Sequence, residues 1–219
     1  MHRISVGVLA GGKRMSGGRN DVLRELHNRR NIKRLAGELA CGEGIFSEML
    51  ISDTQNGRYE DLGQKVVYDA HGDIGPMGGL YQVIACAASD HVFVCAADMP
   101  FVDRKLMEYM AGYVTDEVDC YVLADEKRLH PLCAIYSKKV LPVVEALIAA
   151  GRYRLSEIFH HVRTLYIRLA LTGFGKRVVR NLYVRIKNEV AEIFEVVWHL
   201  PLRRSGKSYL LVRVINEYI

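Results

Sequence analysis

The stretch VLAGGKRMSGGRND, residues 8–21, decides the fold predicted for this chain of 219 residues. It begins inside the apolar, β-branched run ISVGVLA, which predicts a buried parallel strand. It then contains four glycines and three basic residues. Glycine lets the backbone approach a ligand closely, and successive N–H groups at a helix start bind anions. The stretch therefore predicts an anion-binding loop with countercharge from Lys13, Arg14 and Arg19; a purely structural turn is the alternative.

The composition predicts an ordinary globular protein, with 50% hydrophobic and 25% charged residues. No apolar run approaches the roughly 20 residues of a membrane span, and the N-terminal apolar stretch is too short for a signal peptide. We therefore expect a cytoplasmic protein without membrane association. The net charge of +5 suits an anionic ligand such as a nucleotide. Basic residues are not interleaved with aromatic ones in a stripe, so we expect no nucleic-acid partner.

Apolar runs typical of strands alternate with stretches of helical spacing along the chain. Strands are predicted at 4–10, 48–53, 64–69, 91–98, 119–125 and 131–137, and helices at 21–39, 77–89, 103–114, 138–151 and 154–162. This alternation predicts an α/β fold with a mostly parallel sheet, in which ligands bind outside the carboxyl ends of the strands. Three notable stretches lie at such ends: LAGGKRMSGG, YDAHGDIGPMGG and CAADMPFV.

Asp98 follows the most apolar of the predicted strands, where an unpaired carboxylate would be costly. Mg²⁺ prefers one or two carboxylates together with ligand phosphates, so Asp98 is the candidate metal ligand. Asp69 follows another strand, and we expect it to reach the same region. Taken singly, each aspartate is also typical of a turn or a helix N-cap.

Four segments together resemble a known family: LAGGKRMSGGRNDVLREL, VVYDAHGDIGPMGGL, CAADMPFV and HPLCAIYSKKVLPVVEALIAAGRYRLSEIF. Their order and spacing are similar to those of the molybdenum cofactor guanylyltransferases, also called molybdopterin-guanine dinucleotide biosynthesis protein A. The resemblance implies a Rossmann-like nucleotidyltransferase fold, with a mostly parallel central sheet and helices on both faces, in a domain of residues 1–193. It also implies transfer of GMP from MgGTP to molybdenum-bound molybdopterin, with release of pyrophosphate.

The resemblance also implies roles for individual residues. Asp98 would bind Mg²⁺, and Arg14 or Arg19 would neutralise the leaving pyrophosphate. Asp69 would lie near the guanine or the ribose. The nucleotide-binding set as a whole comprises Leu9, Ala10, Gly11, Gly12, Lys13, Asp69, Gly75 and Gly79.

Three departures from the family pattern leave alternatives open. Val22 stands where the family has a phosphate-binding lysine, which favours a weakened or non-catalytic nucleotide-binding relative. Arg185 and Lys187 stand at asparagine positions on the pterin side, where they would hold an anionic phosphate. The tail, residues 194–219, resembles the truncated start of a P-loop partner protein. The P-loop protein and molybdoenzyme chaperones are candidate partners. A cytidylyltransferase of the same cofactor pathway is a further alternative.

Overall fold

The computed structural model describes residues 2–11, 19–40, 44–54, 57–69, 71, 74–124 and 128–168, with residues 19–23 described by their backbone alone. In chain order the elements are β1 (Ile4–Leu9), α1 (Arg19–Ala40), β2 (Phe46–Asp53), η1 (Glu60–Leu62), β3 (Lys65–Tyr68), α2 (Pro76–Cys86), β4 (His91–Ala96), α3 (Arg104–Ala111), β5 (Cys120–Ala124), β6 (Leu129–Ser137), η2 (Lys138–Val140), α4 (Leu141–Ala149), η3 (Leu155–His160) and β7 (Thr164–Arg168).

The described strands form a seven-stranded sheet in the order β3-β2-β1-β4-β6-β5-β7. Among them β6 alone runs antiparallel to its neighbours, β4 and β5. The strand β1 lies between β2 and β4, so its carboxyl end is flanked by the ends of both. The mostly parallel α/β sheet predicted from the sequence is therefore confirmed.

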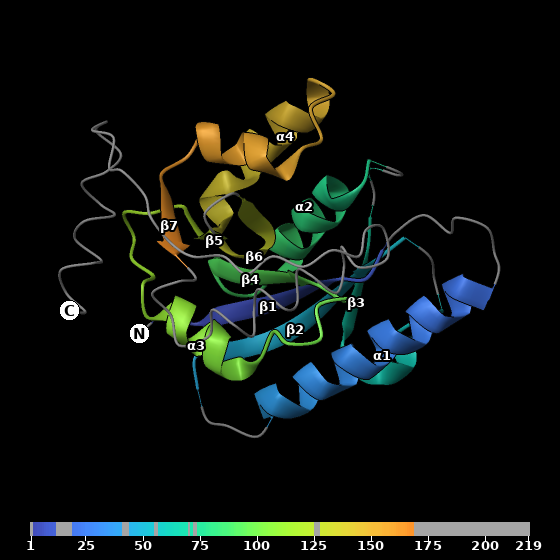
Figure 1. Cartoon of the computed structure of the whole chain (residues 1–219). Helices are drawn as coiled ribbons and strands as arrows, with labels where there is room; N and C mark the ends of the chain where they lie inside the picture. The colour runs from blue at the N-terminus through green and yellow to red at the C-terminus, as the bar shows by residue number, and fades with distance from the viewer. Residues whose placement is uncertain are drawn as a thin grey trace, which may run out of the picture.

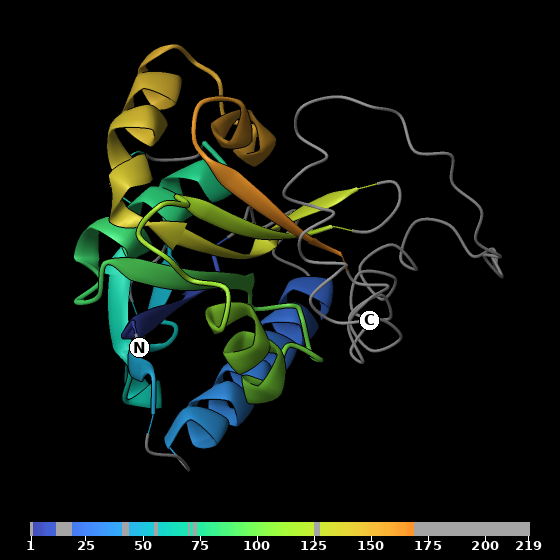
Figure 2. The same cartoon turned by 90° about the vertical axis from the view of Figure 1, so that its left-hand side faces the viewer.

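Helices cover both faces of the sheet, as Figures 1 and 2 show. The helices α1 and α3 pack on one face, where Ile32, Leu35 and Leu106 meet side chains of β1 and β4. The helices α2 and α4 pack on the other face with η3. Strands buried on both faces must be apolar throughout, and β1 and β4 are fully buried along their length.

Local sequence signals explain where the helices begin and end. Asp103 is the N-cap of α3, and its side chain accepts a hydrogen bond from the Leu106 N–H. Pro142 lies in the first turn of α4, where the N–H that proline lacks has no intrahelical partner to lose. After α4, Gly151 takes a positive φ of 70°, which favours glycine and ends the helix.

Several expectations differ from the structure in detail. The predicted helix 77–89 ends early, at Cys86, and the strand β7 at Thr164–Arg168 was not predicted. Residues Leu155–His160 form a 3₁₀-helix within the predicted helix 154–162, and i→i+3 bonds such as Glu157 N–H to the Arg154 carbonyl account for its tighter winding. The predicted helix 103–114 ends early, at Ala111, because i→i+3 turns follow it. The predicted tail at 194–219 lies outside the described residues. Within the described part of the chain, every helix is too short or too polar to span a membrane.

Gly7 is expected to be essential for packing between β1 and α2. A Cβ added at Gly7 would lie 2.8 Å from Cγ2 of Val83, and neighbouring side chains are fully buried. We expect Gly7→Ala to lower the free energy of unfolding by about 1–3 kcal/mol through overpacking. Urea unfolding monitored by circular dichroism measures this change.

Gly37 provides the matched control, because no atom lies within 4 Å of a Cβ added there. Gly37 is exposed and lies in the interior of α1. Because alanine has a higher helix propensity than glycine, Gly37→Ala should raise the free energy of unfolding by about 1 kcal/mol. Equal effects of the two substitutions would contradict the packing described for Gly7.

Candidate functional site

The turn after β1 is fixed against the end of β2. The N–H groups of Ala10 and Gly11 both donate to the carbonyl of Ser52, at 2.9 and 3.1 Å. A Cβ added at Gly11 would lie 3.2 Å from Cγ2 of Thr54, so the two chains are closely packed here. These two N–H groups therefore already have a backbone acceptor.

The turn after β4 lies directly beside the turn after β1. The Ala97 N–H donates to the carbonyl of Leu9 at 3.0 Å, and the Met99 N–H donates to the carbonyl of Ala96 at 3.2 Å. Asp98 lies within this turn, partly exposed, with its Oδ1 atom buried. The structure thus brings the turn that carries Asp98 next to Leu9 at the end of β1; the sequence had assigned both residues to one site.

Two side chains of helix α1 donate hydrogen bonds to backbone carbonyls of the turn after β4. Asn31 Nδ2 donates to the carbonyl of Ala97 at 3.0 Å, and Arg34 Nη2 donates to the carbonyl of Val102 at 2.7 Å. The sequence analysis assigned no role to either residue. The spacing of the two residues could have indicated a shared role, because residues three apart in a helix lie on one face and can reach the same neighbouring turn.

Asp69 lies at the other end of this sheet edge, beside α2. Its N–H donates to the carbonyl of Asp53 at 3.1 Å, and its Oδ1 accepts from the His71 N–H at 2.9 Å. A Cβ at Gly78 would overlap the Asp69 carboxylate, which therefore rests against the first turn of α2. The strand preceding Asp69 is three positions from β4 in the sheet, roughly 14 Å away. A nucleotide could span that distance, whereas a single Mg²⁺ ion could not be ligated by both carboxylates.

Gly75 and Gly79 are required for two different reasons. Gly75 precedes α2 with a φ of 73°, a conformation that side chains other than that of glycine rarely adopt. At Gly79 a Cβ would lie 2.9 Å from Ser52 Oγ and 3.5 Å from Leu9 Cδ2. Gly79 thus lets α2 approach the sheet where β1 and β2 end.

A buried ion pair at the end of β2 was missed by the sequence analysis. Asp53 is fully buried, and its carboxylate accepts hydrogen bonds from Nε and Nη2 of Arg58, the first at 2.7 Å. Its Oδ1 also accepts the Thr54 N–H at 2.7 Å. The two residues are only five positions apart in the sequence. Outside helices and strands, however, such a spacing does not predict that an arginine and an aspartate pair.

The exposed Tyr68 lies next to Asp69 and binds Glu60. The Tyr68 hydroxyl donates to Glu60 Oε1, and this bond, with that of the Gly57 N–H at 2.6 Å, lowers the pKa of Glu60 from its ordinary value of 4.5 to about 2. The same bond raises the pKa of the Tyr68 phenol. These contacts hold η1 against the end of β3, the edge strand of the sheet.

Several predicted site residues lie outside the part of the chain that the structure describes. For Arg19 the structure describes only the backbone, at the first position of α1. The remaining predicted residues outside the described part are Gly12, Lys13, Arg14, Arg185 and Lys187. Their assigned roles stay predictions.

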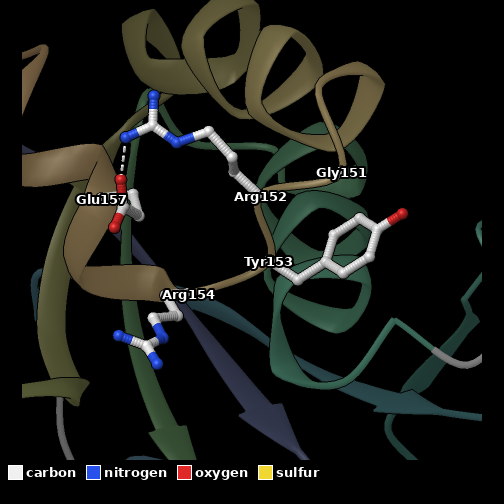
Figure 3. A pocket seen from close by; sticks show the side chains of 5 residues that line it. All are labelled: Gly151, Arg152, Tyr153, Arg154 and Glu157. Carbon is white, nitrogen blue, oxygen red and sulfur yellow. Dashed lines mark hydrogen bonds and ion pairs between the residues drawn. The ribbon is translucent and has the colours of Figure 1, made fainter.

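A separate hollow follows α4 and contains none of the predicted site residues. It is lined by Gly151, Arg152, Tyr153, Arg154 and Glu157. Figure 3 shows Arg152 reaching across to pair with Glu157, while Tyr153 points away from that pair. Because Glu157 already compensates one of the two guanidinium groups, the hollow carries less positive charge than its arginines suggest.

The donor set at Asp98 fits Mg²⁺ better than a softer metal. Carboxylate oxygens are hard ligands, and Mg²⁺ commonly binds through one or two of them plus substrate phosphates. Within the described ranges no group of three or more His, Cys, Asp or Glu side chains is arranged to hold a metal. The described cysteines 86, 95, 120 and 133 are free thiols, and burial raises the pKa of Cys95 to about 12.

Comparisons with known proteins show the family to which the chain is related. The model of the MobA-like NTP transferase domain family matches residues 6–165, more than half of the chain. A relative from Pelotomaculum thermopropionicum, named "Probable molybdenum cofactor guanylyltransferase", is 31% identical over 160 residues, covering 73% of this chain and 76% of that one. A Desulfosudis oleivorans relative named molybdenum cofactor guanylyltransferase is 28% identical over 159 residues, covering 71% and 76%.

Solved structures show the same arrangement of the sheet and helices. A crystal structure of an Aquifex aeolicus protein superposes with a TM-score of 0.64 at 27% identity, covering 75% of this chain and 85% of that one. Molybdopterin-guanine dinucleotide biosynthesis protein A from Archaeoglobus fulgidus has the same fold, with a TM-score of 0.60 at 18% identity, covering 84% and 99%. The fold and the family match together define a Rossmann-like nucleotidyltransferase. Within that class, the chain belongs to the MobA-like NTP transferase family.

Glu60 provides a test of the contacts beside Asp69. Because its pKa in the folded protein is below 4.5, its ionised form stabilises the fold above pH 4.5, and this contribution is lost as the pH falls toward about 2. We expect Tyr68→Phe to raise the pKa of Glu60 toward 4.5. Carbon-13 NMR titration of the side-chain carboxyl group measures it. An unchanged pKa would show that Tyr68 does not donate to Glu60.

Proposed function

We propose that the protein transfers GMP from MgGTP to molybdenum-bound molybdopterin and releases pyrophosphate. The family and the names of its relatives support this reaction. The observation that supports the proposal is the 3.0 Å bond from the Ala97 N–H to the Leu9 carbonyl, because it joins the turn that carries Asp98 to the end of β1. An anion-binding loop and a metal-binding carboxylate are the two groups that a nucleoside triphosphate requires.

The nucleotide would lie along the carboxyl edge of the sheet. Its phosphates would lie between the glycine-rich stretch and Asp98, and its base and ribose would extend over β2 toward Asp69. Gly75 and Gly79 keep the start of α2 close to this edge without adding side chains. Val22 lies in the first turn of α1, which begins at Arg19.

The reaction requires positioning more than covalent chemistry from the protein. A phosphate oxygen of molybdopterin attacks the α-phosphorus, a new phosphorus–oxygen bond forms, and the bond to the β-phosphate oxygen breaks in line. Arg14 or Arg19 would neutralise the leaving pyrophosphate, and Arg185 and Lys187 would hold the phosphate of the pterin. Asp98 would hold Mg²⁺, which would offset negative charge on the phosphates. Aligning the two reactants is the main contribution of the rigid strand-end turns.

We place this reaction in the cytoplasm and propose the P-loop protein and molybdoenzyme chaperones as its partners. A pyrophosphate-release assay with GTP, Mg²⁺ and molybdenum-loaded molybdopterin tests the activity. Release with CTP in preference to GTP would indicate the cytidylyltransferase alternative. Nucleotide binding without any release would indicate a non-catalytic relative, the alternative that Val22 favours.

Asp98→Asn should lower Mg²⁺-dependent pyrophosphate release by about 10²-fold or more, since a neutral amide is a poor ligand for this cation. The circular dichroism spectrum should not change. Asp90→Asn is the matched control, because Asp90 is exposed just before β4, at the opposite edge of the sheet. Full activity in Asp98→Asn would remove Asp98 from the proposed role.

Val22→Lys should raise the rate of pyrophosphate release by about tenfold, because it restores a cation that offsets phosphate charge. Val22→Met, which adds length without charge, is its control. A rate that stays at the starting value in both variants would mean that Lys13 or Arg19 already supplies this charge.

A further inference from the structure

We propose that the ion pair of Asp53 and Arg58 is a positioning device that fixes the turn after β1, at Ala10 and Gly11, for nucleotide binding. The statement about binding rests on the proposed function, whereas the statement about positioning does not. The network consists of Asp53, Arg58, Thr54, Arg29 and Asp61. It connects the end of β2 to the turn after β1 on one side and to α1 on the other.

The first link in the network is the ion pair itself. Asp53 has no exposed surface and the Arg58 side chain is 12% exposed, so both charges are largely withdrawn from water. Arg58 uses Nε and Nη2 in a forked contact with the two carboxylate oxygens. This planar geometry fixes the direction of the carboxylate, which a single-point contact would not do.

The second link runs from Asp53 to the glycine turn. Asp53 Oδ1 accepts the Thr54 N–H at 2.7 Å, which fixes the backbone of Thr54 directly after β2. Thr54 in turn lies against Gly11, with its Cγ2 3.2 Å and its N 3.5 Å from the position of an added Cβ. Movement of Thr54 would therefore disturb the turn after β1 at Gly11.

The third link joins the same arginine to α1. Arg29 Nη1 donates to the Arg58 carbonyl, and Arg29 Nη2 pairs with Asp61. Helix α1 is thereby held against the residues that follow β2. A turn that is already held in place, such as that at Ala10 and Gly11, has fewer conformations to lose when a ligand binds, which favours binding.

Stability alone is a poor explanation for this ion pair. Buried ion pairs are often no more stabilising than apolar side chains of similar volume. An apolar pair could not accept the Thr54 N–H, and it would leave that bond unmade. The geometry points to placement of Thr54 and Gly11 as the consequence that distinguishes this pair from an apolar contact.

The test compares Asp53→Asn, Arg58→Lys, Arg58→Gln and the double variant Asp53→Asn/Arg58→Gln in the full chain. Asp119→Asn is the matched control, because Asp119 also forms a forked pair, with Arg163 at 3.2 Å, and accepts a backbone N–H at 3.1 Å. It precedes β5, at the opposite edge of the sheet. Amide hydrogen exchange of Ala10 and Gly11 without nucleotide, and the Kd for GTP with Mg²⁺ by calorimetry, are measured.

We expect exchange at Ala10 and Gly11 to accelerate about tenfold in Asp53→Asn and Arg58→Gln, as for loss of one charged hydrogen bond. The Kd for GTP should rise by a similar factor. Arg58→Lys should give a smaller change in both, and it remains informative if Asp53→Asn does not fold. The double variant should show no more than either single change, because the residues act as one unit. Asp119→Asn should change neither measurement.

Unchanged exchange at Ala10 and Gly11 in Asp53→Asn and Arg58→Gln would overturn the proposal, as would a double variant equal to the sum of the single changes. Accelerated exchange with an unaltered Kd for GTP would overturn the link to binding. If the unsubstituted protein binds no GTP, the proposed function fails. Amide exchange at Ala10 and Gly11 in the variants still decides whether the ion pair positions the turn after β1.

Discussion

Backbone hydrogen bonds at the end of β1 are the constraint on which the candidate site depends. The Leu9 carbonyl accepts the Ala97 N–H at 3.0 Å, and the Ser52 carbonyl accepts the N–H groups of Ala10 and Gly11. These bonds extend past the last paired residues of the sheet and join three strand ends into one rigid edge. They are possible because β1 lies between β2 and β4. The turns that carry Gly11 and Asp98 are therefore both joined by hydrogen bonds to the end of a neighbouring strand.

Helix α1 explains how a chain with a glycine-rich loop keeps this edge ordered. The helix runs beneath the sheet (Figure 1). Its polar residues contact both flanking turns. Asn31 and Arg34 bind carbonyls of the turn after β4, and Arg29 binds the carbonyl of Arg58 beyond β2. Some polar residues of α1 therefore have a structural role, because their side chains donate hydrogen bonds to backbone carbonyls that the sheet leaves unpaired.

Much of the fold could be predicted from the sequence, and less of the site. Strands such as Ile4–Leu9 and His91–Ala96 are apolar throughout because both faces are covered, and that pattern is visible in one dimension. The N-cap at Asp103 is equally local. In contrast, the pairing of Asp53 with Arg58 depends on how irregular chain returns to the sheet. The separation of Asp69 from Asp98 depends on strand order, which hydrophobic periodicity does not encode.

The account is tested most directly by the anomalous scattering of Mn²⁺ in crystals grown with a non-hydrolysable GTP analogue. It predicts one metal peak within ligand distance of the Asp98 carboxylate, with the phosphates between Asp98 and the turn at Gly11 and the base toward Asp69. A metal bound elsewhere, or a nucleotide seated in the hollow beside Arg152 and Arg154, would contradict it.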